Sequence, residues 1–377
     1  MLSPKIVFQL LKDLDINFFT GVPDSLLKNF CAYAEDNLPK ENHVIAANEG
    51  SAVAIAAGYH LASNKVPLIY MQNSGFGNAI NSILSLADSD VYSIPMILFV
   101  GWRGEPNVKD EPQHLKQGRV MVELIESMEL DYEIIDSESS DFSNKLTSVV
   151  SIAKSKKVPV VVLIKKNTFE SYEYRPQAFF ETILSREKAI SEILDNVPEE
   201  TIIISTTGKT SRELYEIRSK HNMGHHKDFL TVGSMGHTSS IALGIAKVKK
   251  NSHVVCIDGD GSVLMHMGSL CVNAEQNPKN LTHIVINNGA HESVGGQPTA
   301  ARLSSISKIA KSAGYKKIIA VEMIEEIKDA INECLKYENG PCLIEIFVNT
   351  DVRKDLGRPT SSPIQNKEEF MNWILKK

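Results

Sequence analysis

The sequence predicts an α/β protein with two similar domains, each a parallel sheet with helices on both faces. The first observation is that short apolar segments alternate with helix-like segments through most of the 377 residues. The second is that this alternation stops once, near residues 169–184, and then begins again. Such alternation is typical of right-handed βαβ units, whose parallel strands are buried on both faces.

In the first half, six segments have the short apolar pattern of buried strands. They are residues 17–20, 43–47, 67–71, 96–100, 132–135 and 158–164. Helical patterns lie between them, at 25–35, 51–62, 76–86, 114–128 and 141–155. The stretch from 167 to 184 has no clean period and contains Pro176, so we interpret it as a linker. We therefore expect one domain at 1–168, a linker at 169–184 and a second domain at 185–377.

The second half repeats the plan. Ser185 precedes an apolar-periodic run and is expected to cap its helix. The expected strands are 201–205, 229–232, 253–257, 282–287, 317–321 and 342–348. The expected helices are 186–195, 210–219, 238–248, 263–275, 304–313, 324–337 and 367–376.

Bulk composition excludes several classes of protein. A net charge of −6 gives no reason to expect nucleic acid as a partner. The five cysteines are odd in number and form no Cys-x-x-Cys pair, which favours a reducing compartment, the cytoplasm. The N-terminus does not have the layout of a signal peptide, and no apolar run approaches the ~18 residues of a membrane span. We expect no membrane association.

The motif Gly259-Asp260-Gly261-Ser262 follows an apolar run, and Asn287-Asn288 follows another. The spacer between them accommodates one helix and one strand, so both motifs are expected at one edge of a parallel sheet. Mg²⁺ prefers oxygen ligands, which the Asp260 carboxylate, the Asn288 side chain and the Ala290 carbonyl would supply. Gly259 and Gly261 would let the backbone approach a diphosphate, and the helix from Ser262 would offer free N–H groups to it.

A plain glycine turn or a calcium loop are the alternatives. The calcium loop fails because apolar residues, Val263, Leu264 and Met265, occupy its middle.

Glu49 lies between a predicted strand and the alanine-rich helix that starts at Ser51. Poor solvation there would favour proton sharing by its carboxyl group, as activation of an aminopyrimidine requires. The alternative is a glutamate that stabilises a helix N-terminus.

The chain resembles the thiamine diphosphate-dependent decarboxylases of the pyruvate decarboxylase and acetolactate synthase superfamily. The matching segments are NEGSAVAIAAGY, NSGFGNAINSI, GSMGHTSSIALGIA and GDGS…NN. Within that superfamily it is similar to the phosphonopyruvate decarboxylases, in TGVPDSLLK, AHESVGGQPT, DLGRPTSSP and the lack of a middle domain. Sulfopyruvate decarboxylases are the nearest cousins.

The resemblance implies a pyrimidine-binding domain at 1–168 and a diphosphate- and Mg²⁺-binding domain at 185–377. It implies that Glu49 activates the cofactor, that Gly75 contacts the cofactor, that Met235 supports its bent form, and that the Gly233 carbonyl accepts its 4′-amino group. Asp260 and Asn288 match the metal ligands. This sequence departs from many relatives in having Asn48 before the glutamate and a single histidine, His114, in the loop that follows the fourth strand.

The substrate implied is a 2-keto acid with a terminal phosphonate, decarboxylated in phosphonate biosynthesis. Arg and Lys suit such a group. The candidates are Arg103, Lys109, Arg353 and Arg358, with Arg302 and Lys354 as further possibilities. His114, His291 and Asp24 are the candidates for proton transfer.

Three other functions stay open: sulfopyruvate decarboxylation, carboligation by the same chemistry, and a non-catalytic binding paralogue. The last is disfavoured by the joint presence of Glu49, Asp260 and Asn288. In this superfamily the cofactor bridges domains of different chains, so at least a homodimer is expected.

Overall fold

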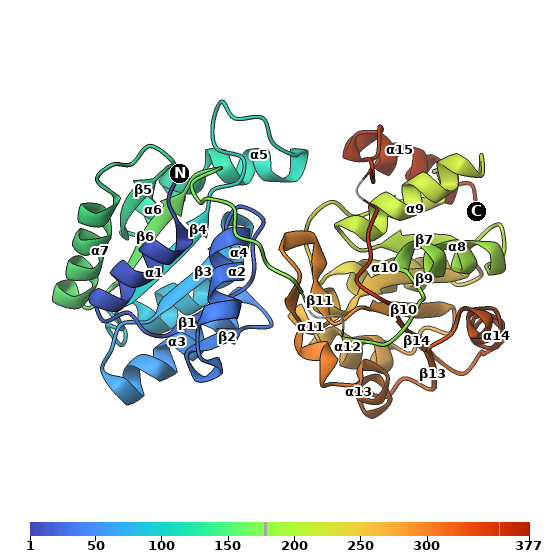
Figure 1. Cartoon of the computed structure of the whole chain (residues 1–377). Helices are drawn as coiled ribbons and strands as arrows, with labels where there is room; N and C mark the ends of the chain where they lie inside the picture. Colours follow the sequence, from blue (N-terminus) through green and yellow to red (C-terminus); the bar gives the residue numbers. More distant parts are fainter. Residues whose placement is uncertain (177–178, 354) are drawn as a thin grey trace. The chain divides into compact units, whose positions relative to one another are not determined.

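The computed structural model describes residues 1–176, 179–353 and 355–377, and it contains two compact units (Figure 1). Unit 1 comprises Met1–Pro176 together with His291–Gln297. Unit 2 comprises Gln177–Ala290 and Pro298–Lys377. Each unit has its own six-stranded sheet, so we describe each by itself.

The sheet of unit 1 has the strand order β2-β1-β3-β4-β6-β5, and all neighbouring strands run parallel. Its strands are β1 (Phe19–Gly21), β2 (His43–Ile45), β3 (Leu68–Gln72), β4 (Met96–Gly101), β5 (Asp131–Ile135) and β6 (Pro159–Ile164). Its helices are α1 (Pro4–Asp13), α2 (Lys28–Asn37), α3 (Glu49–Ser63), α4 (Asn73–Ser82), α5 (Pro112–Arg119), α6 (Met121–Ser127) and α7 (Phe142–Lys156).

Successive residues of each strand face opposite cores, as a sheet covered on both faces requires. Leu68 and Tyr70 of β3 pack in the core that α1, α2 and α7 cover. Ile69 and Met71 pack in the core on the other side, which α3, α4 and α6 cover.

The sheet of unit 2 has the order β13-β14-β10-β9-β7-β8 and is also parallel. Its strands are β7 (Ile202–Ser205), β8 (Asp228–Leu230), β9 (Val254–Gly259), β10 (Leu281–Asn287), β13 (Lys317–Val321) and β14 (Cys342–Phe347). Its helices are α8 (Arg186–Asn196), α9 (Lys209–Lys220), α10 (Thr238–Val248), α11 (Asp260–Met265), α12 (Gly268–Gln276), α13 (Ile306–Ala313), α14 (Ile324–Leu335) and α15 (Pro363–Ile374).

Both sheets have the same topology. When the six strands of each sheet are renumbered in chain order, both have the order 2-1-3-4-6-5. The prediction of two similar α/β domains is therefore confirmed. In such folds, ligands bind at the carboxyl ends of the strands, where successive connections leave in opposite directions. That point lies between β1 and β3 in unit 1 and between β7 and β9 in unit 2.

Two helices expected from the sequence are each split in two. The segment 114–128 forms α5 and α6, and the break lies at Val120, whose φ and ψ are −91° and −1°. The segment 263–275 forms α11 and α12, separated at His266, whose φ and ψ are −135° and 52°. A short ladder of β11 (Ala290–His291) and β12 (Gln297–Pro298) was not expected, because two-residue strands carry no periodic signal.

The caps and cysteines agree with the sequence analysis. Ser185 accepts a hydrogen bond from the backbone N–H of Lys188 and caps α8. All five cysteines have free thiols. Among the described residues, none of the helices combines the length and apolar character that crossing a membrane would require.

Ile344, on β14, tests the core of unit 2. Its side chain is fully buried, so Ile344→Ala should lower the free energy of unfolding by about 2–5 kcal/mol. Ile183, which is 95% exposed, provides the control, and Ile183→Ala should change stability by less than about 0.5 kcal/mol. Urea unfolding of both variants measures the difference, and equal losses would contradict the assigned core.

Candidate active site

The pairing of β9 and β10 brings the two predicted metal-binding motifs together. Ile286 pairs with Gly259, so Asp260 and Asn288 follow adjacent strand ends. Asp260 is the first residue of α11 and is buried. Its carboxylate accepts hydrogen bonds from the hydroxyl of Thr299 and from backbone N–H groups that include that of Asn288. Burial raises the pKa of Asp260 to about 6, against the effect of these hydrogen bonds.

The chemistry of this turn fits a divalent cation that carries a diphosphate. Among the described residues, no lysine or arginine pairs with the Asp260 carboxylate, although a buried carboxylate normally needs a positive partner. The Asn288 side-chain oxygen accepts from the Ala290 N–H over 3.0 Å, within the turn that follows β10. Space for an approaching ligand exists at Gly259, because a Cβ there would have only one neighbour, 4.0 Å away.

A hydroxyl network that the sequence analysis missed surrounds the turn. Ser262 Oγ accepts from Thr206 Oγ1 over 3.2 Å and from the Gly236 N–H over 3.0 Å. It therefore ties the end of β7 and the segment before α10 to the Gly-Asp-Gly turn. Thr299 acts similarly from the loop after β10, since its own N–H donates to the Gly289 carbonyl. Thr206 could have been found from the sequence, because it directly follows a predicted strand and begins the motif Thr-Thr-Gly.

Gly233 and Met235 lie in the segment between β8 and α10, and both are partly buried. Their neighbour Gly236 is held by Ser262, so this segment and the metal turn belong to one site in unit 2. The structure thus brings together Gly233, Met235, Ser262 and the two predicted metal ligands.

Glu49 is the first residue of α3 and is buried, with 6% of its surface exposed. The Asn48 side chain caps the helix by accepting from the Ser51 N–H. Asn78 donates to Glu49 Oε2 over 2.9 Å. Gly75 lies so close that a Cβ there would be 2.2 Å from Glu49 Oε1, so only glycine fits beside this carboxyl group.

Asp24 occupies the switch point of unit 1 and is fully buried. It accepts from the Leu26 and Leu27 N–H groups and from Gln72, at the end of β3. Burial raises the pKa of Asp24 in spite of these hydrogen bonds. Asp24 therefore both caps the turn before α2 and holds its proton more tightly than an exposed aspartate.

The loop after β4 and the helix α5 that follows it carry three predicted residues. Arg103 forms a bidentate ion pair with Asp110 and also donates to the Ser25 hydroxyl. Lys109 is exposed. His114 is buried, and desolvation together with the charge of Arg103 lowers its pKa to about 4. The His114 ring is therefore uncharged at neutral pH.

The described cations that follow in the second half, also predicted to bind the substrate, are either paired with other side chains or exposed. Arg353 pairs with the carboxylates of Glu187, Glu216 and Asp355. It lines a cavity of about 300 Å³ together with Lys209, Arg212, Val352 and Leu356. Arg358 is exposed, and Arg302 stacks on the Phe179 ring 5.7 Å away. Lys354 lies outside the described residues.

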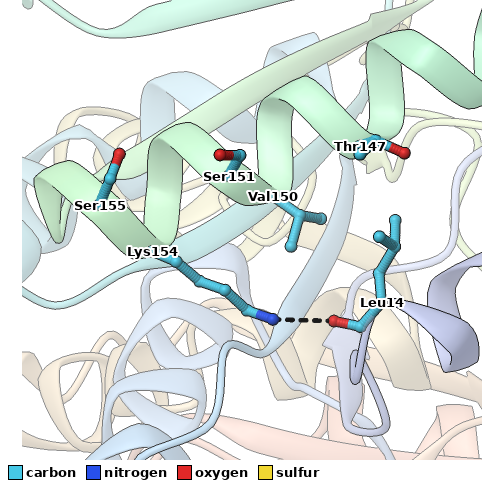
Figure 2. Close-up of a pocket in the computed structure, with 6 residues that line it drawn as sticks. All are labelled: Leu14, Thr147, Val150, Ser151, Lys154 and Ser155. Atoms are coloured by element: carbon cyan, nitrogen blue, oxygen red, sulfur yellow. Dashed lines mark hydrogen bonds between the residues drawn. The ribbon is translucent and has the colours of Figure 1, made fainter.

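One predicted residue, His291, and one further cavity have still to be located in the fold. His291 lies in β11, within the hairpin that joins Gly289 to Thr299. A cavity of about 410 Å³ lies between the end of α1 and α7, where Lys154 donates to the Leu14 carbonyl (Figure 2). No predicted site residue lines that cavity, so it has no part in the site.

Sequence comparison matches a segment of each half of the chain to the same family. Residues 4–124 match the family model "Thiamine pyrophosphate enzyme, N-terminal TPP binding domain". Residues 206–346 match "Thiamine pyrophosphate enzyme, C-terminal TPP binding domain". The chain belongs to the thiamine pyrophosphate enzyme family, and the cofactor expected from the sequence is confirmed.

Within this family, the chain is similar to three curated decarboxylases or decarboxylase subunits. The chain is 29% identical to a phosphonopyruvate decarboxylase of Streptomyces viridochromogenes, over 97% of this chain and 93% of that protein. It is 28% identical to a sulfopyruvate decarboxylase of Methanosarcina acetivorans, over 87% and 86%. It is 39% identical to the sulfopyruvate decarboxylase subunit beta of Methanocaldococcus jannaschii, over 50% and 95%.

Gly75→Ala tests the contact beside Glu49. The new methyl group would displace the Glu49 carboxyl group, so catalytic activity should fall about 100-fold, as expected for a misplacement near 1 Å. Gly77 is on the same helix and has open space at its Cβ position. Gly77→Ala is thus the control, and steady-state kinetics with added thiamine diphosphate should show it unchanged. Similar activity of the two variants would contradict the assigned contact.

Proposed function

We propose that this enzyme converts 3-phosphonopyruvate to phosphonoacetaldehyde and CO₂, with thiamine diphosphate and Mg²⁺, in phosphonate biosynthesis. The observation that carries the proposal is the pair of buried carboxyl sites in a chain that aligns over 97% of its length with a phosphonopyruvate decarboxylase. Asp260 with Asn288 is one of these sites, and Glu49 with Gly75 is the other. The overall reaction consumes one proton, which must reach the carbon that loses CO₂.

In this proposal, Asp260, Asn288 and the Ala290 carbonyl hold Mg²⁺, and Gly259, Gly261 and Ser262 hold the diphosphate. The thiazolium ring, once bound, supplies the electron sink for decarboxylation. Glu49 would hydrogen-bond the aminopyrimidine and would hold the proton that activation of the cofactor requires. Met235 and Gly233 contact the cofactor from the segment before α10.

Proton delivery to the product is assigned to Asp24 ahead of His114 and His291. The raised pKa of Asp24 favours a carboxyl group that still carries its proton. The uncharged His114 ring lacks the acidic proton of an imidazolium.

For the phosphonate group, Lys109 is the favoured ligand in unit 1, because it is exposed in the loop after β4. Arg103 would support that loop through Asp110. In unit 2, Arg353 would anchor the C-terminal segment on Glu187 and Glu216, and Arg358 would reach the substrate.

We further infer a homodimer or larger homo-oligomer in the cytoplasm. The support is the superfamily's use of domains from different chains for each cofactor, and the five free thiols. Sulfopyruvate decarboxylation is the second candidate, favoured by the Methanosarcina relative. It differs from the first only in the charge and shape of the acid group.

Glu49→Gln tests the cofactor-activating role. The amide cannot exchange a proton, so the rate of CO₂ release should fall by about 10²–10⁴-fold while thiamine diphosphate still binds. Glu41→Gln, at an exposed position in the same unit, should leave the rate unchanged. Full activity of the Glu49 variant would refute the mechanism.

A panel of keto acids tests the substrate. The purified protein with thiamine diphosphate and Mg²⁺ should release CO₂ and aldehyde from 3-phosphonopyruvate faster than from sulfopyruvate or pyruvate. The dianionic phosphonate gains more from paired cations than a sulfonate does. Turnover of sulfopyruvate alone would replace the first candidate with the second.

A further inference from the structure

Behind the proposed metal site lies a buried carboxylate that the catalytic roles do not use. Glu345 is on β14, which pairs with β10, and its side chain is completely buried. Among the described residues, no lysine or arginine pairs with it. An acidic side chain in that position normally costs stability, so its retention needs an explanation.

Three N–H donors surround Glu345. The Asn287 side-chain amide donates to its Oε1 over 2.9 Å. The backbone N–H groups of Ile306 and Ser307 donate to Oε1 and Oε2 over 3.3 and 2.8 Å. The N–H groups of Ile306 and Ser307 lie in the first turn of α13 and have no acceptor within the helix, so Glu345 supplies one. The helix dipole also favours a negative charge there.

Asn287 connects Glu345 to the turn formed by residues 288–290, and at each step the donor lies on the side of the turn. Asn287 uses its amide N–H to reach Glu345, which leaves its Oδ1 to accept from the Gly289 N–H over 3.0 Å. Gly289 has φ of +67°, a conformation that glycine adopts without strain. This turn separates Asn288 from Ala290, the two groups of the loop that are proposed to bind the metal.

We propose that Glu345 and Asn287 are positioning residues for the metal site: together they set the polarity of the Asn288–Ala290 turn. The proposal rests on the proposed function, which places Mg²⁺ at Asp260, Asn288 and Ala290. A carboxylate at residue 345 can only accept hydrogen bonds, so it forces Asn287 to present Oδ1 to the turn. The turn then has one hydrogen-bonded conformation, with the Asn288 side chain and the Ala290 carbonyl in place.

An exchange of the two side-chain types tests this polarity. In Glu345→Gln, the new amide N–H would oppose either the Asn287 amide N–H or the Ser307 N–H, so at least one hydrogen bond is lost in each orientation. In Asn287→Asp, two carboxylates would face each other. In the double variant, the amide introduced at position 345 could donate to the carboxylate introduced at position 287. That carboxylate could still accept from the Gly289 N–H, so both hydrogen bonds of residue 287 are restored, while the longer bond from the Ile306 N–H, 3.3 Å, is lost.

The measurement is the affinity for Mn²⁺, followed by electron paramagnetic resonance with saturating thiamine diphosphate. Asn287→Asp should raise the Kd for Mn²⁺ by about 10–100-fold, the usual effect of losing a group that orients metal ligands. Glu345→Gln should raise it less, because one orientation of its amide keeps the bond to Asn287. The double variant should recover the wild-type Kd or a lower one. Tighter Mn²⁺ binding by Asn287→Asp alone would show that added charge governs affinity and would overturn the proposal.

Asn366 provides a matched control. It is buried, its Oδ1 accepts from the Leu230 N–H, and its amide donates to the Asp228 carbonyl, so it resembles Asn287 in its bonding. Asn366→Asp should lower the melting temperature without changing the Kd for Mn²⁺. If Asn366→Asp raised the Kd for Mn²⁺ as much as Asn287→Asp does, the effect would reflect general loss of stability, and the positioning role of Glu345 and Asn287 would be refuted. Absence of Mn²⁺ binding by the wild-type protein would instead refute the proposed function.

Discussion

The pairing of β9 with β10 is the interaction on which the site depends. Because the strands are parallel and in register from Leu281 with Val254 onward, the two chain segments that follow them emerge side by side. An acidic turn at Asp260 and an amide turn at Asn288 are therefore neighbours without any long loop. A slip of one residue would also turn every buried side chain of β9 to the other face, so the core enforces the register.

The two units use the same topology for different chemistry. Unit 1 has Asp24 and Gln72 at its switch point, and unit 2 has Thr206 and the Gly-Asp-Gly turn at the equivalent place. At both switch points, these buried polar side chains are bonded to N–H and O–H groups and form no ion pairs with any residue that the structure describes. Hydrogen bonds to neutral donors fix the geometry of such sites, and the buried carboxylates there can still bind a ligand that supplies positive charge.

Most of the fold could be predicted from the sequence because parallel strands are continuous apolar runs and the motifs lie at their ends. Asp260, Asn288 and Glu49 were found for that reason. Contacts between distant segments could not be predicted. The Thr299 bond to Asp260 and the Arg353 pairs with Glu187 and Glu216 join residues that no local period relates. The breaks at Val120 and His266 escaped for the same reason, since local helical pattern continues through both.

The hairpin between Gly289 and Thr299 has a consequence for how such enzymes diversify. Its two ends are joined by the Thr299 N–H to the Gly289 carbonyl, and Thr299 also bonds Asp260. Residues inside the hairpin can therefore be lengthened, shortened or replaced while its base stays closed around the metal turn. Substitutions at those positions therefore leave the hydrogen bond between Thr299 and Asp260 intact, and the base of the hairpin tolerates sequence change within it.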